Sequence, residues 1–424
     1  MSRTTTQRAD VALSAACKCR FCGQELTDSF VDLGMSPLCQ THVSPEQLGE
    51  MEPFYPLHAY ICSNCFLVQL QEFVAPQDIF GEYAYFSSYS DSWVAHAKRY
   101  AEAMVARFGF DGASKVIEIA SNDGYLLQHF VAMDIPVLGI EPAANVAQAA
   151  IEKGVRSMVA FMGRETAAKI ASEYGKADLL LGNNVLAHVP DLNDFVGGMK
   201  ILLADRGVIT MEFPHLLQLM SLNQFDTIYH EHFSYFSFYT VEKVFAAHGI
   251  VLFDVEELDT HGGSLRIYGR HEGDASKPVG DRVKALRERE IAAGITDLAT
   301  YRGFAEQVRE TKRKLLEFLI EAKRAGKSIV GYGAPGKGNT LLNYCGIRQD
   351  FLDYTVDRNP YKQGKFTPGT RIPIYDPSRI SETRPDYILI LPWNLKDEIC
   401  RQMGFVRQWG GQFVVPIPEV QVIP

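Results

Sequence analysis

The middle of the chain alternates short apolar runs with amphipathic segments of helical period. Runs of strand length occupy 115–120, 136–141, a stretch near 155–161, 177–184 and 207–214. Between them, apolar residues recur every three or four positions, as in a helix, over 124–133, 144–154, 164–175 and 191–205. Strands that alternate with helices predict an α/β, doubly wound parallel sheet.

Further elements flank this region. The segment 91–108 has helical spacing, and 252–259 with 263–271 has the pattern of an antiparallel pair. A charge-rich stretch, 281–326, predicts connecting helices. After it, 328–346 has the pattern of a strand, a glycine-rich turn and a helix, and strands are expected in 386–394 and 412–420. We therefore expect a second, Rossmann-like α/β unit at the C-terminal end.

Length and composition limit the fold and its partners. A chain of 424 residues exceeds what a single core usually supports, and we place domains at 1–88, 89–275 and 276–424. The hydrophobic fraction of 46% and charged fraction of 22% are ordinary for a globular protein. A net charge of -9 disfavours nucleic acid as a partner, and no apolar run is long enough to cross a bilayer. We expect a cytoplasmic monomer without a membrane partner.

The cysteines are concentrated near the start of the chain. Six of the eight lie within the first 65 residues, and they include two C-x-x-C pairs, Cys19 with Cys22 and Cys62 with Cys65. Thiolates at this spacing can face one tetrahedral ion, so the four predict a structural zinc site with no open position. Reduced structural cysteines or disulfides are the alternatives, and Cys17 or Cys39 is available to replace one ligand.

Polar residues follow the first two strands of the central region. Asn122, Asp123 and Gly124 come after the first strand, which contains Glu118, and the second ends in Glu141. A carboxylate there can accept both hydroxyls of a ribose. The dinucleotide signature G-x-G-x-x-G is absent, and S-adenosylmethionine, which has no phosphate, needs only a shorter polar loop. Turns rich in Asn, Asp and Gly also follow strands that bind nothing.

The order of several unusual strings resembles one enzyme family. They are CRFCGQEL, YICSNCFLVQL, VIEIASNDGYLL, LGIEPAANVA, NNVLAHVPDL, FDTIYHEHFSYFS, HGGSLRIY and VGYGAPGKGNTLLNYCGI, which lie between residues 19 and 347. The chain is similar to S-adenosylmethionine-dependent sugar C-methyltransferases, which add a methyl branch to keto-deoxysugars carried on a nucleotide diphosphate. This resemblance implies a class I methyltransferase sheet between a zinc module and a Rossmann-like domain. One departure is Ala120, which stands where methyltransferases often have a glycine.

The resemblance also implies roles for individual residues. The expected S-adenosylmethionine pocket comprises Glu118, Ala120, Asn122, Asp123, Gly124, Glu141, Pro142 and Asn184. The expected catalytic residues are Tyr83, His188, Tyr229, Glu231 and His232, with His232 as the general base.

Methylation of carbon requires a base and a hydrogen-bond donor, and the residues named above are of these types. A carbon next to a ketone becomes nucleophilic when a base removes its proton, and histidine suits this step near neutral pH. Tyr229 or His188 is then expected to donate a hydrogen bond to the enolate oxygen. Each of these residues also has an alternative interpretation. The YHEH segment is then a surface loop, or His230 and His232 lie on one strand face and form a second metal site, and His261 is a simple turn residue.

The glycine-rich turn of the C-terminal unit offers backbone N–H groups and Lys337 as a phosphate cradle. We assign Lys337 and Tyr332 to the nucleotide-sugar substrate, with Asp357, Lys362 and Lys365 nearby; a fold retained for structure alone is the alternative. For the whole chain, the alternatives are an O- or N-methyltransferase of another small metabolite, and a dehydrogenase or nucleotide-binding regulator. The absence of G-x-G-x-x-G argues against the last class.

Overall fold

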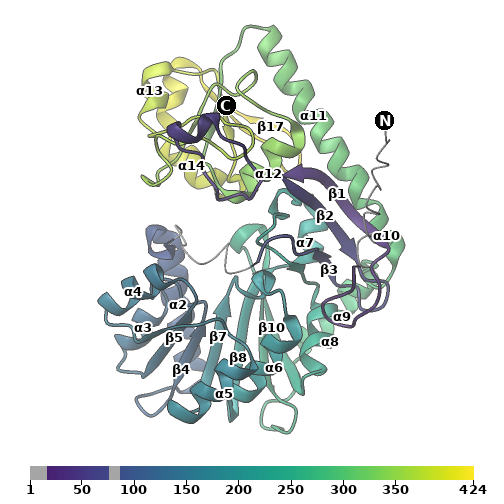
Figure 1. The fold of residues 1–424 in the computed structure, drawn as a ribbon, viewed down its shortest axis with the longest axis vertical. Helices are drawn as coiled ribbons and strands as arrows, with labels where there is room; N and C mark the ends of the chain where they lie inside the picture. Colours follow the sequence, from purple (N-terminus) through teal and green to yellow (C-terminus); the bar gives the residue numbers. More distant parts are fainter. Residues whose placement is uncertain (1–16, 76–85) are drawn as a thin grey trace, which may run out of the picture.

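The structure, a computed structural model, describes residues 17–75 and 86–424. Within these residues the strands form three sheets (Figure 1). A seven-stranded sheet occupies the middle of the chain, a six-stranded sheet the C-terminal part, and a four-stranded sheet joins the N-terminal part to a segment from the middle.

The seven-stranded sheet has the order β10-β11-β8-β7-β4-β5-β6. Its strands are β4 (Val116–Ile119), β5 (Val137–Glu141), β6 (Ser157–Val159), β7 (Ala177–Asn183), β8 (Leu203–Pro214), β10 (Ile250–Leu258) and β11 (Ser264–His271). Strands β4 to β8 pair in parallel, whereas β11 runs antiparallel to both of its neighbours. The five apolar runs expected as strands are all strands. Strands β4, β5, β7 and most of β8 are buried inside the sheet, whereas β6 is an edge strand and is only partly buried.

Helices connect these strands or flank them in the chain. They are α2 (Asp91–Phe108), α3 (Leu127–Val131), α4 (Ala144–Glu152), α5 (Arg164–Glu173), α6 (Leu192–Leu202), α7 (Leu216–Ser221), α8 (Phe238–Ala246) and α9 (Asp281–Ala292). Helix α3 is shorter than its apolar pattern suggests, because 124–126 remain in the turn that follows β4. The chain leaves β4 toward β5 on one side and returns to β7 on the other. The carboxyl ends of β4 and β7 are therefore the topological switch point, here named the crevice, at which doubly wound sheets bind ligands.

The C-terminal part repeats the layered plan on a smaller scale. Its sheet has the order β14-β13-β12-β15-β16-β17, and all pairs are parallel except β16 with β17. The strands are β12 (Ile329–Tyr332), β13 (Thr355–Val356), β14 (Ile374–Tyr375), β15 (Tyr387–Ile390), β16 (Gln412–Val415) and β17 (Gln421–Ile423). The helices are α10 (Leu298–Arg302), α11 (Phe304–Arg324), α12 (Gly336–Cys345), α13 (Arg379–Thr383) and α14 (Lys396–Gln402). The expected Rossmann-like unit is therefore present.

The N-terminal sheet has one strand from far along the chain. Its order is β1 (Asp28–Ser36), β2 (Tyr55–Ile61), β3 (Val68–Leu70) and β9 (Ser234–Tyr235). Val68 of β3 pairs with Tyr235 of β9, directly after the YHEH segment, residues 229–232. The N-terminal module is thereby tied to the segment expected to carry the catalytic base.

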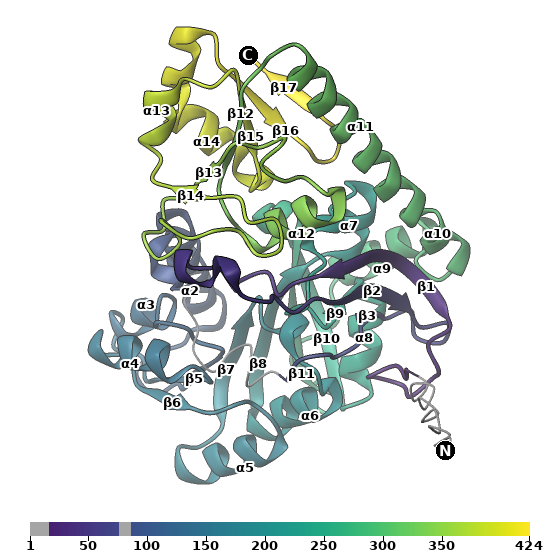
Figure 2. The same cartoon turned by 45° about the horizontal axis from the view of Figure 1, so that its top comes forward.

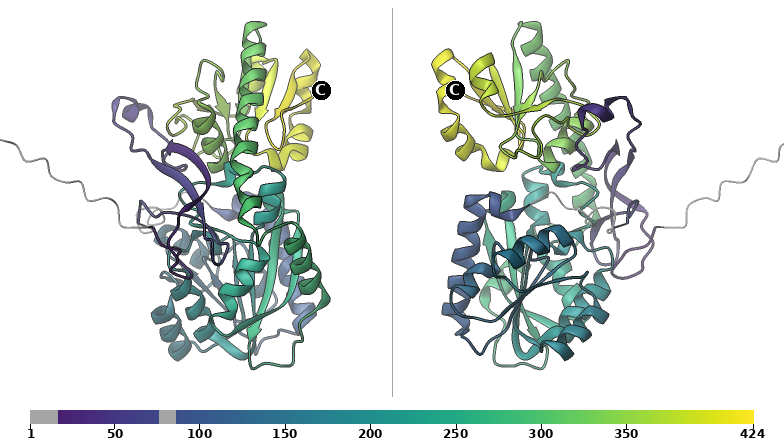
Figure 3. Two further views of the ribbon diagram at one scale, coloured as in Figure 1. Left: turned by 90° about the vertical axis from the view of Figure 1, so that its right-hand side faces the viewer. Right: turned by 60° about the vertical axis from the view of Figure 1, so that its left-hand side comes forward.

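The three parts pack on one another. The long helix α11 runs beside the C-terminal sheet and down to β1 (Figures 2 and 3), where Phe304 stacks on Phe30 at 4.6 Å between ring centroids. The carboxyl ends of β7 and β8 face the C-terminal domain (Figures 1 and 2). No helix in the described parts of the chain is both long enough and apolar enough to span a bilayer.

Candidate active site and zinc centre

Four cysteines from two tight turns converge in the N-terminal module. Their Sγ atoms all lie within 4.8 Å of one another, with 3.5 Å between Cys19 and Cys65 and 3.5 Å between Cys22 and Cys62. A tetrahedral zinc with bonds of about 2.3 Å separates its sulfurs by about 3.8 Å, so the four thiolates fit this ion. Gln69 donates a hydrogen bond to Cys19 Sγ at 3.2 Å, as outer residues around a metal site often do.

Other candidate ligands lie apart from this cluster. Within residues 17–75 and 86–424, the four cysteines form the only group of three or more potential ligands. That group leaves out Cys17 and Cys39, and it leaves out His230 and His232. All four positions of the cluster are protein sulfurs, so the ion it fits is structural.

The turn after β4 and the end of β5 come together as expected. Glu141 accepts the backbone N–H of Asn122 and that of Ala143, both at 2.9 Å. The turn is left-handed at Ala120 (φ 55°), Asn122 (φ 49°) and Gly124 (φ 77°). Ala120 thus adopts a glycine-type conformation, which explains the glycine common at this position.

Helix α2 and the residues before it cover this turn. The Ser87 N–H donates to Asn122 Oδ1 at 2.8 Å, and Ser88 hydrogen-bonds Asp123. Lys153 pairs with Asp123 at 2.7 Å. These contacts form a polar wall next to the crevice.

Glu118 lies on the floor of this region, within β4. Its side chain is fully buried and neither carboxyl oxygen contacts a donor among the described residues. Burial, together with the nearby Glu141 and Asp123, raises the pKa of Glu118 well above its usual value. A buried acid without donors is costly, so this position fits a ligand that brings its own hydrogen-bond donors.

His232 and two other predicted residues form an aromatic cluster. The His232 ring lies 4.0 Å from Tyr229 and 4.7 Å from His188, between centroids. His232 Nδ1 is 2.9 Å from the Thr227 carbonyl oxygen, so Nδ1 carries the proton and Nε2 keeps its lone pair. Burial, then the neighbouring His188, lowers the pKa of His232 well below its usual value, so the ring is neutral. Burial likewise lowers the pKa of His188 to about 4.

The two residues that precede His232 in the YHEH segment, His230 and Glu231, contact the N-terminal module. Cys39 donates its S–H to Glu231 Oε1 at 3.3 Å. His230 lies 3.2 Å from the Pro56 carbonyl oxygen and packs against Tyr55. The expectation that His230 and His232 share one strand face is wrong, because the strand begins only at Ser234 and both histidines precede it in a turn.

Lys337 reaches the same region from the C-terminal domain. It is held by Asn394 Oδ1 at 2.9 Å and lies 4.5 Å from the centre of the Trp393 ring. Burial lowers the pKa of Lys337, although Asp226 nearby opposes this. Tyr332 ends β12 and is also buried, and it lies near the charges of Arg358 and Asp357.

Several residues of the site were not singled out from the sequence. Trp393 donates from Nε1 to Asp226 at 2.7 Å, and this bond joins the C-terminal domain to the segment before YHEH. Asp226 belongs to the FDTIYHEH string and Trp393 to LPWN, but neither string has a spacing that reveals the contact. The predicted Tyr83 lies outside the described residues.

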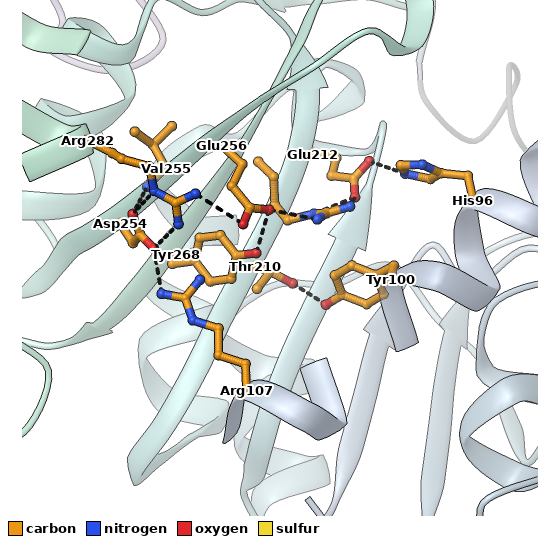
Figure 4. Close-up of polar contacts among 11 residues, drawn as sticks. His96, Tyr100, Arg107, Thr210, Glu212, Asp254, Val255, Glu256, Tyr268 and Arg282 are labelled. Carbon is orange, nitrogen blue, oxygen red and sulfur yellow. Dashed lines mark hydrogen bonds and ion pairs between the residues drawn. The ribbon is translucent and has the colours of Figure 1, made fainter. Parts of the chain in front are cut away.

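A buried charge network fixes helix α2 against the sheet (Figure 4). His96 contacts Glu212 at 2.9 Å, and Glu212 is paired with Arg266 at 2.5 Å. Further along the helix, Arg107 reaches Asp254 at 2.5 Å. A carboxylate that is taken out of water must be paired or hydrogen-bonded, so these contacts to Glu212 and Asp254 hold the helix that covers the cofactor turn in one place.

The strand order, the single reversed strand β11 and the polar turn after β4 define a class I S-adenosylmethionine-dependent methyltransferase. Models of three families match the chain: "Putative zinc binding domain" over 19–80, "Methyltransferase domain" over 93–255 and "C-methyltransferase C-terminal domain" over 259–418. The chain is 36% identical to C-methyltransferase NovU of Streptomyces niveus over 406 residues. This alignment covers 96% of each of the two chains. The chain belongs to this family of C-methyltransferases, with S-adenosylmethionine as cofactor and a zinc-binding N-terminal module.

Two solved methyltransferase structures resemble part of the chain. The alignment with a SAM-dependent methyltransferase from Anabaena variabilis covers 42% of this chain and 86% of the other chain, with 18% identity and a TM-score of 0.35. Magnesium protoporphyrin IX methyltransferase from Synechocystis covers 46% and 88%, with 14% identity and a TM-score of 0.33.

Proposed function

We propose that this C-methyltransferase acts on a nucleotide-diphospho-4-keto-deoxysugar and methylates the ring carbon next to the ketone, with C-3 favoured. The cofactor supplies an electrophilic methyl group. The residues of the chain must remove a proton from carbon, stabilise the resulting enolate and hold the sugar between base and methyl donor.

The state of His232 is the observation that carries this proposal. Its Nδ1–H is anchored on the Thr227 carbonyl, which leaves the Nε2 lone pair available for the sugar C–H. Burial keeps the ring unprotonated, and the bond to a backbone oxygen keeps it in one orientation. His232 takes the proton on Nε2, and electrons of the broken C–H bond pass to the ketone oxygen.

The oxygen that gains charge needs a donor. Tyr229 and His188 flank the base at 4.0 and 4.7 Å, and either is within reach of a substrate that contacts His232. A donor fixed before the reaction stabilises the enolate more than water does, because it requires no reorganisation. Glu231, held by Cys39, is assigned to a hydroxyl or amino group of the sugar.

The C-terminal domain is assigned to the nucleotide diphosphate. The ammonium group of Lys337 lies close enough to lower the pKa of both His232 and His261, so its charge faces the same space. A dianionic diphosphate beside this cation would place the sugar toward His232. Tyr332, at the end of β12, is assigned to the nucleotide.

The test is incubation with S-adenosylmethionine and a panel of nucleotide-diphospho-4-keto-deoxysugars, followed by mass spectrometry and carbon NMR of the product. We expect one added methyl on carbon. A methyl on oxygen or nitrogen, or no product from the whole panel, would contradict the proposed substrate and reaction.

Solvent deuterium exchange tests the base separately. Without cofactor, wild-type protein should exchange the proton next to the ketone, and His232→Ala should slow this by at least about 100-fold. His230→Ala is the matched control, since His230 lies two residues away and contacts Pro56 instead. Equal exchange in His232→Ala and wild type would remove His232 from the role of base.

A further inference from the structure

Two residues at the crevice have a backbone conformation that side chains disfavour. Asn184, directly after β7, has φ 55°, and His261, between β10 and β11, has φ 56°. Residues other than glycine are uncommon in this left-handed region; asparagine is better tolerated there than most. The two positions after His261 are glycines, so the chain carries a histidine at a position where glycine would relieve the strain.

The two strained residues contact each other. Asn184 Nδ2 lies 2.9 Å from His261 Nε2. Because the Asn amide donates only from Nδ2, the imidazole Nε2 is the acceptor and its proton is on Nδ1. The bond therefore fixes which way the Asn184 amide faces: nitrogen toward His261, and the carbonyl oxygen Oδ1 away from it.

Aromatic contacts hold the His261 ring between the crevice and helix α2. Trp93 of α2 contacts His261 edge to face at 5.2 Å between centroids, and Trp93 stacks on Tyr125 at 6.0 Å. Tyr125 directly follows Gly124 of the cofactor turn. The imidazole therefore connects the end of β7 with the turn after β4.

The surroundings prevent the loop from relaxing. Gln224 donates to the Gly262 carbonyl at 2.6 Å, and a β-carbon on Gly262 would come 2.6 Å from the Trp393 ring. On the other side, the Asn184 N–H donates to the Glu212 carbonyl at 2.8 Å. Glu212 is itself held by His96 (Figure 4) and is paired with Arg266. Strain maintained by contacts on every side is typical of functional positions.

We propose that His261 is a positioning residue that turns the Asn184 carbonyl oxygen toward the sulfonium end of bound S-adenosylmethionine. A carbonyl dipole aimed at a positive charge stabilises it, and an amide free to flip would lose that orientation. The inference rests on the expected place of Asn184 in the S-adenosylmethionine pocket, which its position at the carboxyl end of β7 supports. It extends the proposed function by a residue that touches no reacting atom.

The test compares two glycine substitutions at left-handed residues. His261→Gly removes the acceptor and the strain together, whereas Asp134→Gly removes only strain, since Asp134 (φ 59°) is exposed in a turn away from the crevice. Ligand-free Asp134→Gly should keep or raise the wild-type melting temperature, whereas His261→Gly gains from the relief of strain and loses the ring contact with Trp93. Calorimetric titration should give a three- to tenfold higher Kd for S-adenosylmethionine in His261→Gly, about the effect of one hydrogen bond, and no change in Asp134→Gly.

A second pair of variants separates the hydrogen bond from packing. His261→Gln supplies an acceptor and should recover most of the affinity, whereas His261→Leu fills similar space without one and should resemble His261→Gly. Equal Kd values for wild type, His261→Gly and His261→Leu would overturn the inference. So would a lower melting temperature of His261→Gly with unchanged Kd, which is the pattern of a structural residue.

The binding assay contains no sugar, so it also separates this inference from the proposed substrate. If no keto-sugar is methylated while the Kd pattern holds, the substrate proposal fails and the role of His261 stands. If a sugar is methylated but the Kd values are equal, the role of His261 fails and the substrate proposal stands.

Discussion

Asp226 is a buried carboxylate whose ionisation should make the protein less stable as the pH rises. It lies fully buried in the turn Phe225–Thr227, where Oδ2 accepts the Trp393 indole N–H at 2.7 Å. The second oxygen has no hydrogen-bond partner among the described residues. Burial raises the pKa of Asp226 from 3.8 to about 6, although Lys337 and Trp393 oppose the rise.

The size and sign of the effect follow from this shift. Because the native pKa of Asp226 is higher than the unfolded one, the native state holds more protons between pH 4 and pH 6. Its stability therefore falls as the pH rises through this window, by up to about 3 kcal/mol at roughly 1.4 kcal/mol for each pKa unit. Asp226→Asn keeps an oxygen for the indole and cannot ionise. It should gain about that much relative to wild type between pH 4 and pH 7.

Urea unfolding at several pH values measures the difference between variant and wild type. The control is Asp386→Asn: Lys327 and the backbone of Ser328 lower the pKa of Asp386 to about 2, so its difference from wild type should be flat above pH 4. The reasoning is refuted if the Asp226→Asn difference is equally flat, or if the variant loses stability relative to wild type as the pH rises.

Three other substitutions have expected outcomes. Cys62→Ser should lower the zinc content measured by atomic absorption to well under one ion per chain. It should also lower the melting temperature, because ion binding contributes folding free energy. Full zinc content in the variant would contradict the assigned cluster. Trp393→Phe removes the donor to the buried Asp226 carboxylate and should cost about 1.5–3 kcal/mol at pH 7 in urea unfolding, and less at pH 4.5. Arg266→Met removes the cation paired with the buried Glu212 and leaves it only the contact with His96. It should destabilise by about 3–5 kcal/mol, with partial recovery when Glu212→Gln is added. Additive losses would mean that the two residues are not coupled.

Local patterns in the sequence were enough for most of the architecture. The apolar runs at 115–120, 136–141 and 177–184 became β4, β5 and β7 because strands buried on both faces need continuous hydrophobicity. The two C-x-x-C spacings led directly to the zinc cluster, since each pair of ligands is fixed by one tight turn. The polar turn after β4 lies against Glu141 at the end of β5, because neighbouring parallel strands end at the same edge of the sheet.

Contacts between distant segments were decided only by the tertiary structure. The pairing of Val68 with Tyr235, the Cys39–Glu231 bond and the Trp393–Asp226 bond join residues more than 150 positions apart. No local period or spacing encodes such contacts, because they depend on how whole domains pack. The proton position on His232 has the same origin: the sequence supplies an imidazole, but Thr227 and the surrounding protein decide which nitrogen is free and whether the ring is charged.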